Sequence, residues 1–336
     1  MAYVDLSLDP AAMRRIFLAL GLAGADEPVE AVPLAGGVSS GIYRVDLRSG
    51  RYCVKQALPR LKVAKDWQVP VERVFAEIGY LRTVGALVPG HVPKVLGEDA
   101  ASKSFVMAFL GPEYRNWKAE LLAGRVDVAT ARATGAVLGR IHAATADDAR
   151  LAAQFANDAD FHALRLEPYL VETAREHPPL ADRLLQLVER TAGSRRVLVH
   201  GDVSPKNILL GPGGPVLLDA ECAWFGDPAF DLAFCLNHLL LKAAHLPQHA
   251  GALMDSWRAL LQAYWPQVRW EPAAALEQRV ATLLPALTLA RIDGKSPVEY
   301  LGEPQRQRVR EAAIALLRQA PRSLDFIAGR WARDFA

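Results

Sequence analysis

The chain has 336 residues, of which 51% are hydrophobic and 23% are charged. This composition predicts a folded globular protein and excludes a disordered one, and the length favours two lobes over a single core. Thirty-nine basic and thirty-seven acidic side chains give a net charge of +2, which excludes the strong positive field typical of proteins that bind nucleic acid or an anionic membrane surface.

The sequence shows no signal for secretion or for membrane insertion. The N-terminal residues lack a basic start followed by an apolar run, and the most apolar later stretch, residues 232–246, is interrupted by polar side chains. The cysteines, Cys53, Cys222 and Cys235, are odd in number and lack metal-ligand spacing. We therefore expect a soluble, cytoplasmic protein with unpaired thiols; the sequence leaves a monomer and a homodimer open.

After a short helical opening, residues 36–58, GGVSSGIYRVDLRSGRYCVKQAL, predict two strands joined by a tight turn. Alternation along the second strand places Tyr52 and Val54 on its more apolar face and Lys55 on the other face. Apolar residues at helical spacing then predict a helix over residues 69–85.

The run SFVMAFLGP, residues 104–112, predicts a buried strand followed by a break in the chain. We place the first lobe boundary at this break, which divides the chain into residues 1–112 and 113–336. The N-terminal lobe is expected to contain an antiparallel sheet and one main helix.

The second lobe is predicted to be larger and mostly helical, which makes the fold class α+β. Helical patterns cover residues 130–144, 180–190, 230–246, 250–265 and 306–319. Two short β-runs, RRVLVHGD and GPVLLDAE, interrupt the helices. Residues 147–179 are punctuated by Pro, Gly and His, which suggests a variable insertion.

Phosphoryl transfer requires phosphate positioning, charge neutralisation, metal ligands and an acceptor for the proton of the nucleophile. The small residues Gly36, Gly37, Ser39 and Ser40 precede the first long strand and would let backbone N–H groups approach phosphates. The alternative is a plain Gly-rich turn that leads into a strand.

A lysine on a predicted strand and a glutamate on a predicted helix would meet the requirement for charge neutralisation. Lys55 would neutralise phosphates that are not transferred, and Glu77, 22 residues later, would hold it in place. Glu72 is an alternative partner on the same predicted helix, and a solvated surface pair is the structural alternative.

The stretch VHGDVSPKNILL places Asp202 five residues before Asn207, the acid-to-amide spacing of a kinase catalytic loop. Asp202 would accept the proton of an attacking hydroxyl, and Asn207 would bind a metal ion. Lys206 either contacts the transferred phosphate or is solvated. The structural alternative for the whole stretch is an Asx-type turn between strands.

Two further carboxylates follow the next β-run. Asp219 ends this run, and Glu221 lies on the same face two residues later. Magnesium prefers hard oxygen ligands and takes only one or two protein carboxylates beside phosphate oxygens. These residues are therefore candidate metal ligands.

The block HGDVSPKNILL, followed by LLDAECAWFGDPAFDLA, resembles the aminoglycoside phosphotransferase and choline kinase superfamily, over about residues 30–300. The resemblance implies a protein-kinase-like fold, ATP and Mg²⁺ as cofactors, and Asp231 as a support of the catalytic loop. It also implies that adenine binds beside a hinge formed by Met107, Ala108, Phe109 and Leu110.

The first lobe is most similar to 5-methylthioribose kinases, through the run KQALP and a loop containing Trp67. The Asp219-Ala220-Glu221 triplet and Arg291 also match features of those kinases. The interior of the catalytic loop, VSPK, departs from them and leaves the substrate open. Trp224 is a further candidate for the acceptor site, although core burial is the more frequent role of tryptophan.

These patterns predict an ATP- and Mg²⁺-dependent kinase acting on a hydroxyl of a small, possibly sugar-like metabolite, such as a 5-methylthioribose-like or aminoglycoside-like acceptor. Only a few residues separate Asp219 from the sequence GDP at 226–228, which leaves no room for a long activation loop that binds a peptide. Two alternatives remain: a nucleotide-binding pseudokinase without turnover, and a kinase of an amino alcohol such as choline.

Overall fold

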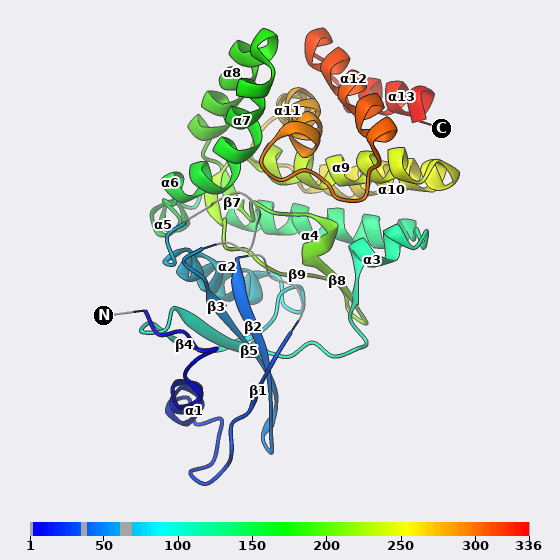
Figure 1. Cartoon of the computed structure of the whole chain (residues 1–336). Helices are drawn as coiled ribbons and strands as arrows, with labels where there is room; N and C mark the ends of the chain where they lie inside the picture. Colours follow the sequence, from blue (N-terminus) through cyan, green and yellow to red (C-terminus); the bar gives the residue numbers. More distant parts are fainter. Residues whose placement is uncertain (1–2, 35–38, 61–68, 336) are drawn as a thin grey trace. The chain divides into compact units, whose positions relative to one another are not determined.

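The computed structural model describes residues 3–34, 39–60 and 69–335 (Figure 1). The chain divides into two compact units, Met1–Glu113 and Tyr114–Ala336, and the sequence analysis placed a boundary at residue 112. Within the described residues, no helix combines the length and the apolar character needed to cross a membrane.

The described residues of the first unit form two helices and a sheet. Its elements are α1 (Pro10–Ala19), β1 (Ala31–Pro33), β2 (Ser40–Leu47), β3 (Gly50–Ala57), α2 (Arg73–Leu87), β4 (Val95–Asp99) and β5 (Ser104–Ala108). The strands form one antiparallel sheet in the order β1-β2-β3-β5-β4. The predicted pair of strands is β2 and β3, and the predicted helix is α2.

The two faces of β3 have different partners, because side chains alternate along a strand. Tyr52 and Val54 belong to an apolar cluster with Met13 and Phe17 of α1. Lys55 lies on the opposite face, where it contacts α2. Helix α1 therefore covers one face of β3 and leaves the other for the charged pair described below.

The second unit is mainly helical. Its elements before β7 are β6 (Arg115–Asn116), α3 (Trp117–Leu122), α4 (Val128–Thr145), α5 (Ala149–Gln154), α6 (Asp158–Phe161), a π-helix (His162–Val171), α7 (Glu172–Glu176) and α8 (Ala181–Gly193). Those that follow are β7 (Val197–Val199), β8 (Ile208–Gly211), β9 (Gly214–Leu217), β10 (Trp224–Gly226), α9 (Pro228–His245), α10 (Ala250–Tyr264), α11 (Ala273–Asp293), α12 (Glu303–Gln319) and α13 (Leu324–Phe335).

Helix α9 is the centre of this unit. Asp227 caps its N-terminus by accepting a hydrogen bond from the backbone N–H of Ala229, and every residue from Pro228 to Ala244 is buried. Helices α10 and α11 pack against α9, and α10 also packs against α4. A helix that is buried on all sides needs no amphipathic pattern, so its few polar side chains are conspicuous.

The short strands frame the loop that carries Asp202. Strand β7 pairs with β10, and β8 pairs with β6 and β9, all antiparallel. The two β-runs predicted from the sequence thus lie in different sheets. Residues 147–179, interpreted as a variable insertion, form α5, α6, the π-helix and α7, and their buried side chains join the core.

Candidate active site

The loop between β7 and β8 is tightly hydrogen-bonded to itself. The N–H of Ser204 donates to the carbonyl of Asp202 at 2.8 Å, and the N–H of Asn207 donates to the carbonyl of Ser204 at 2.9 Å. Gly201 has a φ of +79°, and a Cβ there would lie 2.6 Å from the carbonyl oxygen of Cys222. Only glycine fits both the backbone conformation and the space at this position.

Asp231, in the first turn of α9, anchors the start of this loop. Its carboxylate accepts hydrogen bonds from the N–H groups of His200, at 2.7 Å, and Gly201, at 2.8 Å. His142 lies 3.4 Å from the same carboxylate and 2.8 Å from the hydroxyl of Tyr264. This geometry agrees with the supporting role that the resemblance implies for Asp231.

His200 connects the two ends of the loop as a neutral ring. Its Nδ1 accepts a hydrogen bond from the N–H of Asp202 at 3.1 Å, and its Nε2 donates to the carbonyl of Leu218 at 3.1 Å. Burial lowers the pKa of His200, although nearby carboxylates oppose this shift. His200 therefore supports the structure of the loop.

Asp202 is buried between two cations. Its Oδ2 lies 2.9 Å from a guanidinium nitrogen of Arg165 and 3.4 Å from the Nζ of Lys206. Burial by itself would raise the pKa of Asp202, but the positive charges of Lys206 and Arg165 outweigh burial and hold the pKa below its usual value. These contacts favour the ionised form of Asp202, which can accept a hydrogen bond from a hydroxyl group.

Arg165 is a site residue that the sequence analysis missed. It lies in the π-helix, within the segment interpreted as an insertion. Its guanidinium also donates to the carbonyl of Gly201, and its side chain is only 8% exposed. A π-helix is rare and often occurs at functional sites, but no local pattern in the sequence indicates that one arginine of this segment reaches Asp202.

The candidate metal ligands are oxygen donors, as magnesium requires. The amide nitrogen of Asn207 donates to the carbonyl of Asp202 at 3.2 Å, which leaves the amide oxygen as the atom that would bind a cation. Asp219 is partly exposed and has a φ of +65°, a conformation that non-glycine residues adopt rarely. Glu221 is 8% exposed.

In the described part of the chain, no three His, Cys, Asp or Glu side chains form a metal cluster. A complete protein cage for a metal is therefore not available there. The donor set instead fits a magnesium ion that takes one or two ligands from Asn207 and Asp219 and the rest from phosphate oxygens and water.

In the first unit, Lys55 pairs with Glu77. The Nζ of Lys55 lies 2.7 Å from Oε2 and 2.8 Å from Oε1 of Glu77, and the side chains are 5% and 3% exposed. Glu72, the alternative partner, is exposed and lies 3.4 Å from Lys103 instead. The buried charged pair is costly for stability alone, which favours a functional reason for it.

The structure describes only part of the candidate phosphate-binding loop, residues 36–40. Ser39 and Ser40 are buried, and Arg73 at the start of α2 donates to the carbonyl of Ser39 at 2.6 Å. Gly36 and Gly37 lie outside the described residues. Arg73 was not predicted, and it holds the end of this loop against α2.

The proposed hinge ends the first unit. Met107 and Ala108 are the last residues of β5, and Phe109 and Leu110 follow them; all four are partly exposed. The guanidinium of Arg51 lies 5.4 Å from the ring centre of Phe109. Contact of these four residues with adenine stays a prediction.

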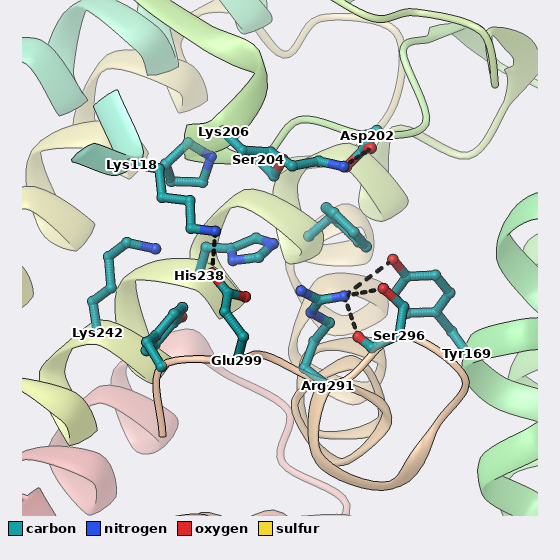
Figure 2. Close-up of a pocket in the computed structure, with 13 residues that line it drawn as sticks. Lys118, Tyr169, Asp202, Ser204, Lys206, His238, Lys242, Arg291, Ser296 and Glu299 are labelled. Atoms are coloured by element: carbon teal, nitrogen blue, oxygen red, sulfur yellow. Dashed lines mark hydrogen bonds and ion pairs between the residues drawn. The ribbon is translucent and has the colours of Figure 1, made fainter. Parts of the chain in front are cut away.

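Asp202 lines a cavity in the second unit (Figure 2). It is lined by Lys118, Tyr169, Asp202, Ser204, Pro205, Lys206, Phe234, His238, Lys242, Arg291, Ser296, Glu299 and Tyr300. Arg291, a predicted substrate residue, donates to the hydroxyl of Ser296 at 2.8 Å and lies 3.4 Å from that of Tyr169. The structure therefore brings Arg291, Lys206 and Asp202 to one cavity.

Of the two candidate tryptophans, the structure describes only Trp224, which does not line this cavity. Trp224 was wrongly considered for the acceptor site, because its side chain is 1% exposed, stacks on Phe161 and donates to Asp158 at 2.9 Å. It is a core residue. Trp67 lies outside the described residues.

The comparison with known families decides the classification. Residues 30–270 match the model of the phosphotransferase enzyme family. The chain belongs to this family. The predicted superfamily is therefore confirmed, and membership implies ATP as the phosphoryl donor.

Relatives within the phosphotransferase family include methylthioribose kinases. Methylthioribose kinase 2 of Oryza sativa is 23% identical over 71% of this chain and 62% of the relative, and methylthioribose kinase of Erwinia tasmaniensis is 27% identical over 67% and 64%. The chain thus matches less than two thirds of the length of these relatives. This agrees with the similarity expected from the first lobe.

A solved structure shows the fold. The ethanolamine kinase of Plasmodium vivax matches with a TM-score of 0.55 at 14% identity, over 96% of this chain and 86% of that protein. The predicted kinase-like α+β fold is confirmed.

Proposed function

We propose that this chain is an ATP- and Mg²⁺-dependent kinase that phosphorylates a hydroxyl group of a small, sugar-like metabolite. One observation carries the proposal: a buried carboxylate, Asp202, lines a polar cavity and lies beside the candidate metal ligand Asn207. Family membership and the methylthioribose kinase relatives support the reaction type and the kind of acceptor.

In the proposed reaction, Asp202 orients the acceptor hydroxyl and accepts its proton. The hydroxyl oxygen forms a bond to the γ-phosphorus, the bond from that phosphorus to the bridging oxygen breaks, and ADP leaves. Arg165 and Lys206 hold the Asp202 carboxylate in place, and Asp231 holds the loop.

Further roles in the proposed reaction concern the nucleotide. Lys55, fixed by Glu77, would pair with phosphate oxygens, and Asn207 and Asp219 would hold magnesium. Magnesium neutralises the charge that develops on the phosphates. Soluble, cytoplasmic location and the absence of a nucleic acid partner remain expectations from the composition.

The test is ADP release by the purified chain with MgATP and a panel of methylthioribose, other pentoses, amino alcohols and aminoglycosides. We expect turnover with a sugar-like acceptor and a loss of about 100-fold or more in Asp202→Asn, with ATP binding retained. Wild-type turnover in this variant would refute the role of Asp202. ATP binding without turnover on any of these acceptors, or on a hydroxylated carboxylate or phosphate, would instead indicate the pseudokinase.

A further inference from the structure

Lys242 is a buried lysine without a hydrogen-bond partner. It lies on α9, is fully buried, and its Nζ makes no hydrogen bond or ion pair in the described structure. The nearest aromatic ring is that of Tyr300, whose centre is 5.1 Å from Nζ. A buried ammonium group without an anion is strongly unfavourable, so a protein that keeps one has a use for it.

The same cavity contains other buried polar groups without partners. The Nε of Arg291, the hydroxyl of Tyr300 and the hydroxyl of Ser204 make no hydrogen bonds with described residues. All of them can donate hydrogen bonds. Figure 2 shows Lys242 and Arg291 on the cavity wall, with no dashed line from Lys242 to any of the residues drawn. The cavity is therefore prepared for a ligand rich in acceptor atoms.

The charges of the cavity are unbalanced. Its lining has four basic side chains, Lys118, Lys206, Lys242 and Arg291, and two carboxylates, Asp202 and Glu299. Both carboxylates are already engaged, because Lys118 pairs with Glu299 and Lys206 pairs with Asp202. Lys242 and Arg291 have no carboxylate within ion-pair distance among the described residues.

His238 adds no charge to the lining of the cavity. It lies one helical turn before Lys242 on α9 and lines the same cavity. Burial, together with the positive charges of Lys242 and Arg291, keeps the pKa of His238 well below its usual value. Its ring is thus neutral and adds a polar contact without a charge.

We propose that the acceptor is an anion whose carboxylate or phosphate group binds to Lys242 and Arg291 while its hydroxyl group contacts Asp202. The inference rests on the proposed kinase function and names the class of its substrate: a small hydroxylated oxyanion. Guanidinium and ammonium groups are the usual partners of such groups. A cationic acceptor would meet two unpaired cations, and a neutral sugar would leave Lys242 unpaired.

The experiment uses four six-carbon sugar derivatives of different charge: glucose, glucosamine, gluconate and glucose 6-phosphate. Binding to the full chain is measured by calorimetry, and ADP release is measured with MgATP in the same buffer. We expect gluconate or glucose 6-phosphate to bind at least about tenfold more tightly than glucose, and glucosamine to bind most weakly. Comparison of gluconate with glucose 6-phosphate shows whether the site prefers a carboxylate or a phosphate group.

Lys242→Met keeps the length of the side chain and removes its charge. We expect it to weaken binding of the preferred anion by about 30-fold or more and to leave glucose binding unchanged. The control is Arg258→Met, which removes one charge from an exposed pair with Asp255 on α10 and should leave anion binding unchanged. Thermal unfolding verifies that both variants are folded.

Two outcomes separate this inference from the proposed function. Preference for glucose or glucosamine, or unchanged anion binding in Lys242→Met, would overturn the anionic acceptor even if ADP release continues. Anion binding that depends on Lys242 but gives no ADP release with any acceptor would support the site and overturn the kinase function.

Discussion

The carboxylate of Asp202 lies 2.9 Å from the guanidinium of Arg165, although 37 residues separate them and Arg165 belongs to a π-helix. Both side chains are less than 10% exposed. The pair keeps the proposed general base ionised inside the protein, and it also connects the catalytic loop to the π-helix through the carbonyl of Gly201.

Arg165→Gln should move the acid limb of the pH profile. Lys206 and Arg165 together hold the pKa of Asp202 low against the opposing effect of burial. Loss of Arg165 raises this pKa, so a higher pH is needed to ionise Asp202, and the acid limb of kcat/KM moves to higher pH. The pH profile of ADP release provides the measurement. Arg165→Lys retains the charge and should move the limb less; an unchanged limb in Arg165→Gln would show that Arg165 does not act on Asp202.

Lys55→Met should reduce both stability and turnover, because it leaves the buried carboxylate of Glu77 without its lysine. Breaking one side of a buried pair costs about 3 kcal/mol or more. The double variant Lys55→Met with Glu77→Gln removes both charges and should recover most of the stability in urea unfolding, yet remain inactive. Recovery of turnover in the double variant would argue against a role for Lys55 in phosphate binding.

Lys242→Met should change how stability depends on pH. Burial, and then the charges of Lys118 and Arg291, lower the pKa of Lys242 to about 7. Between this value and the ordinary lysine value of 10.5, the unfolded chain holds a proton that the folded chain has lost, so this group makes the folded protein more stable as the pH rises. At pH below about 7 the penalty is present in full.

We therefore expect Lys242→Met to be more stable than the wild type near pH 6, and the difference to shrink by about 1.4 kcal/mol per pH unit above pH 7. Urea unfolding at several pH values checks this. Increased stability together with lost anion binding would mark Lys242 as a residue kept for function. A variant that is less stable at every pH would contradict the unfavourable burial of the charge.

Gly201→Ala should disrupt the catalytic loop. A Cβ at this position would lie 2.6 Å from the carbonyl of Cys222, in a backbone conformation with φ of +79°. We expect a loss of stability of about 3 kcal/mol and a large loss of turnover. The control is Gly213→Ala, because a Cβ there meets no atom within 4 Å and should cost less than about 0.5 kcal/mol. Equal effects at the two positions would refute the proposed constraint.

Local patterns were sufficient for the elements and residues that depend on near neighbours. Strand alternation placed Lys55 opposite Tyr52 and Val54, and helical spacing placed Glu77 on α2, because these periods follow from backbone geometry. The choice between Glu72 and Glu77 needed the structure, since it depends on which turn of α2 faces β3.

Signals for the cavity were present but ambiguous. On α9, Phe234, His238 and Lys242 recur every four residues in an otherwise apolar helix, and all three line the cavity. From the sequence, the polar residues of this stretch served only to exclude a membrane span. A polar stripe on a fully buried helix indicates a buried polar surface, and it could have identified Lys242 as a candidate.

The sequence by itself determined the family, several of the helices and strands, and the loop with Asp202 and Asn207, because these depend on short stretches of chain. Only the tertiary structure decided that Arg165 contacts Asp202, that Trp224 belongs to the core, and that Lys242 and Arg291 share one cavity. Such contacts join residues far apart in the chain, and they are selected by packing of whole helices, which no local period encodes.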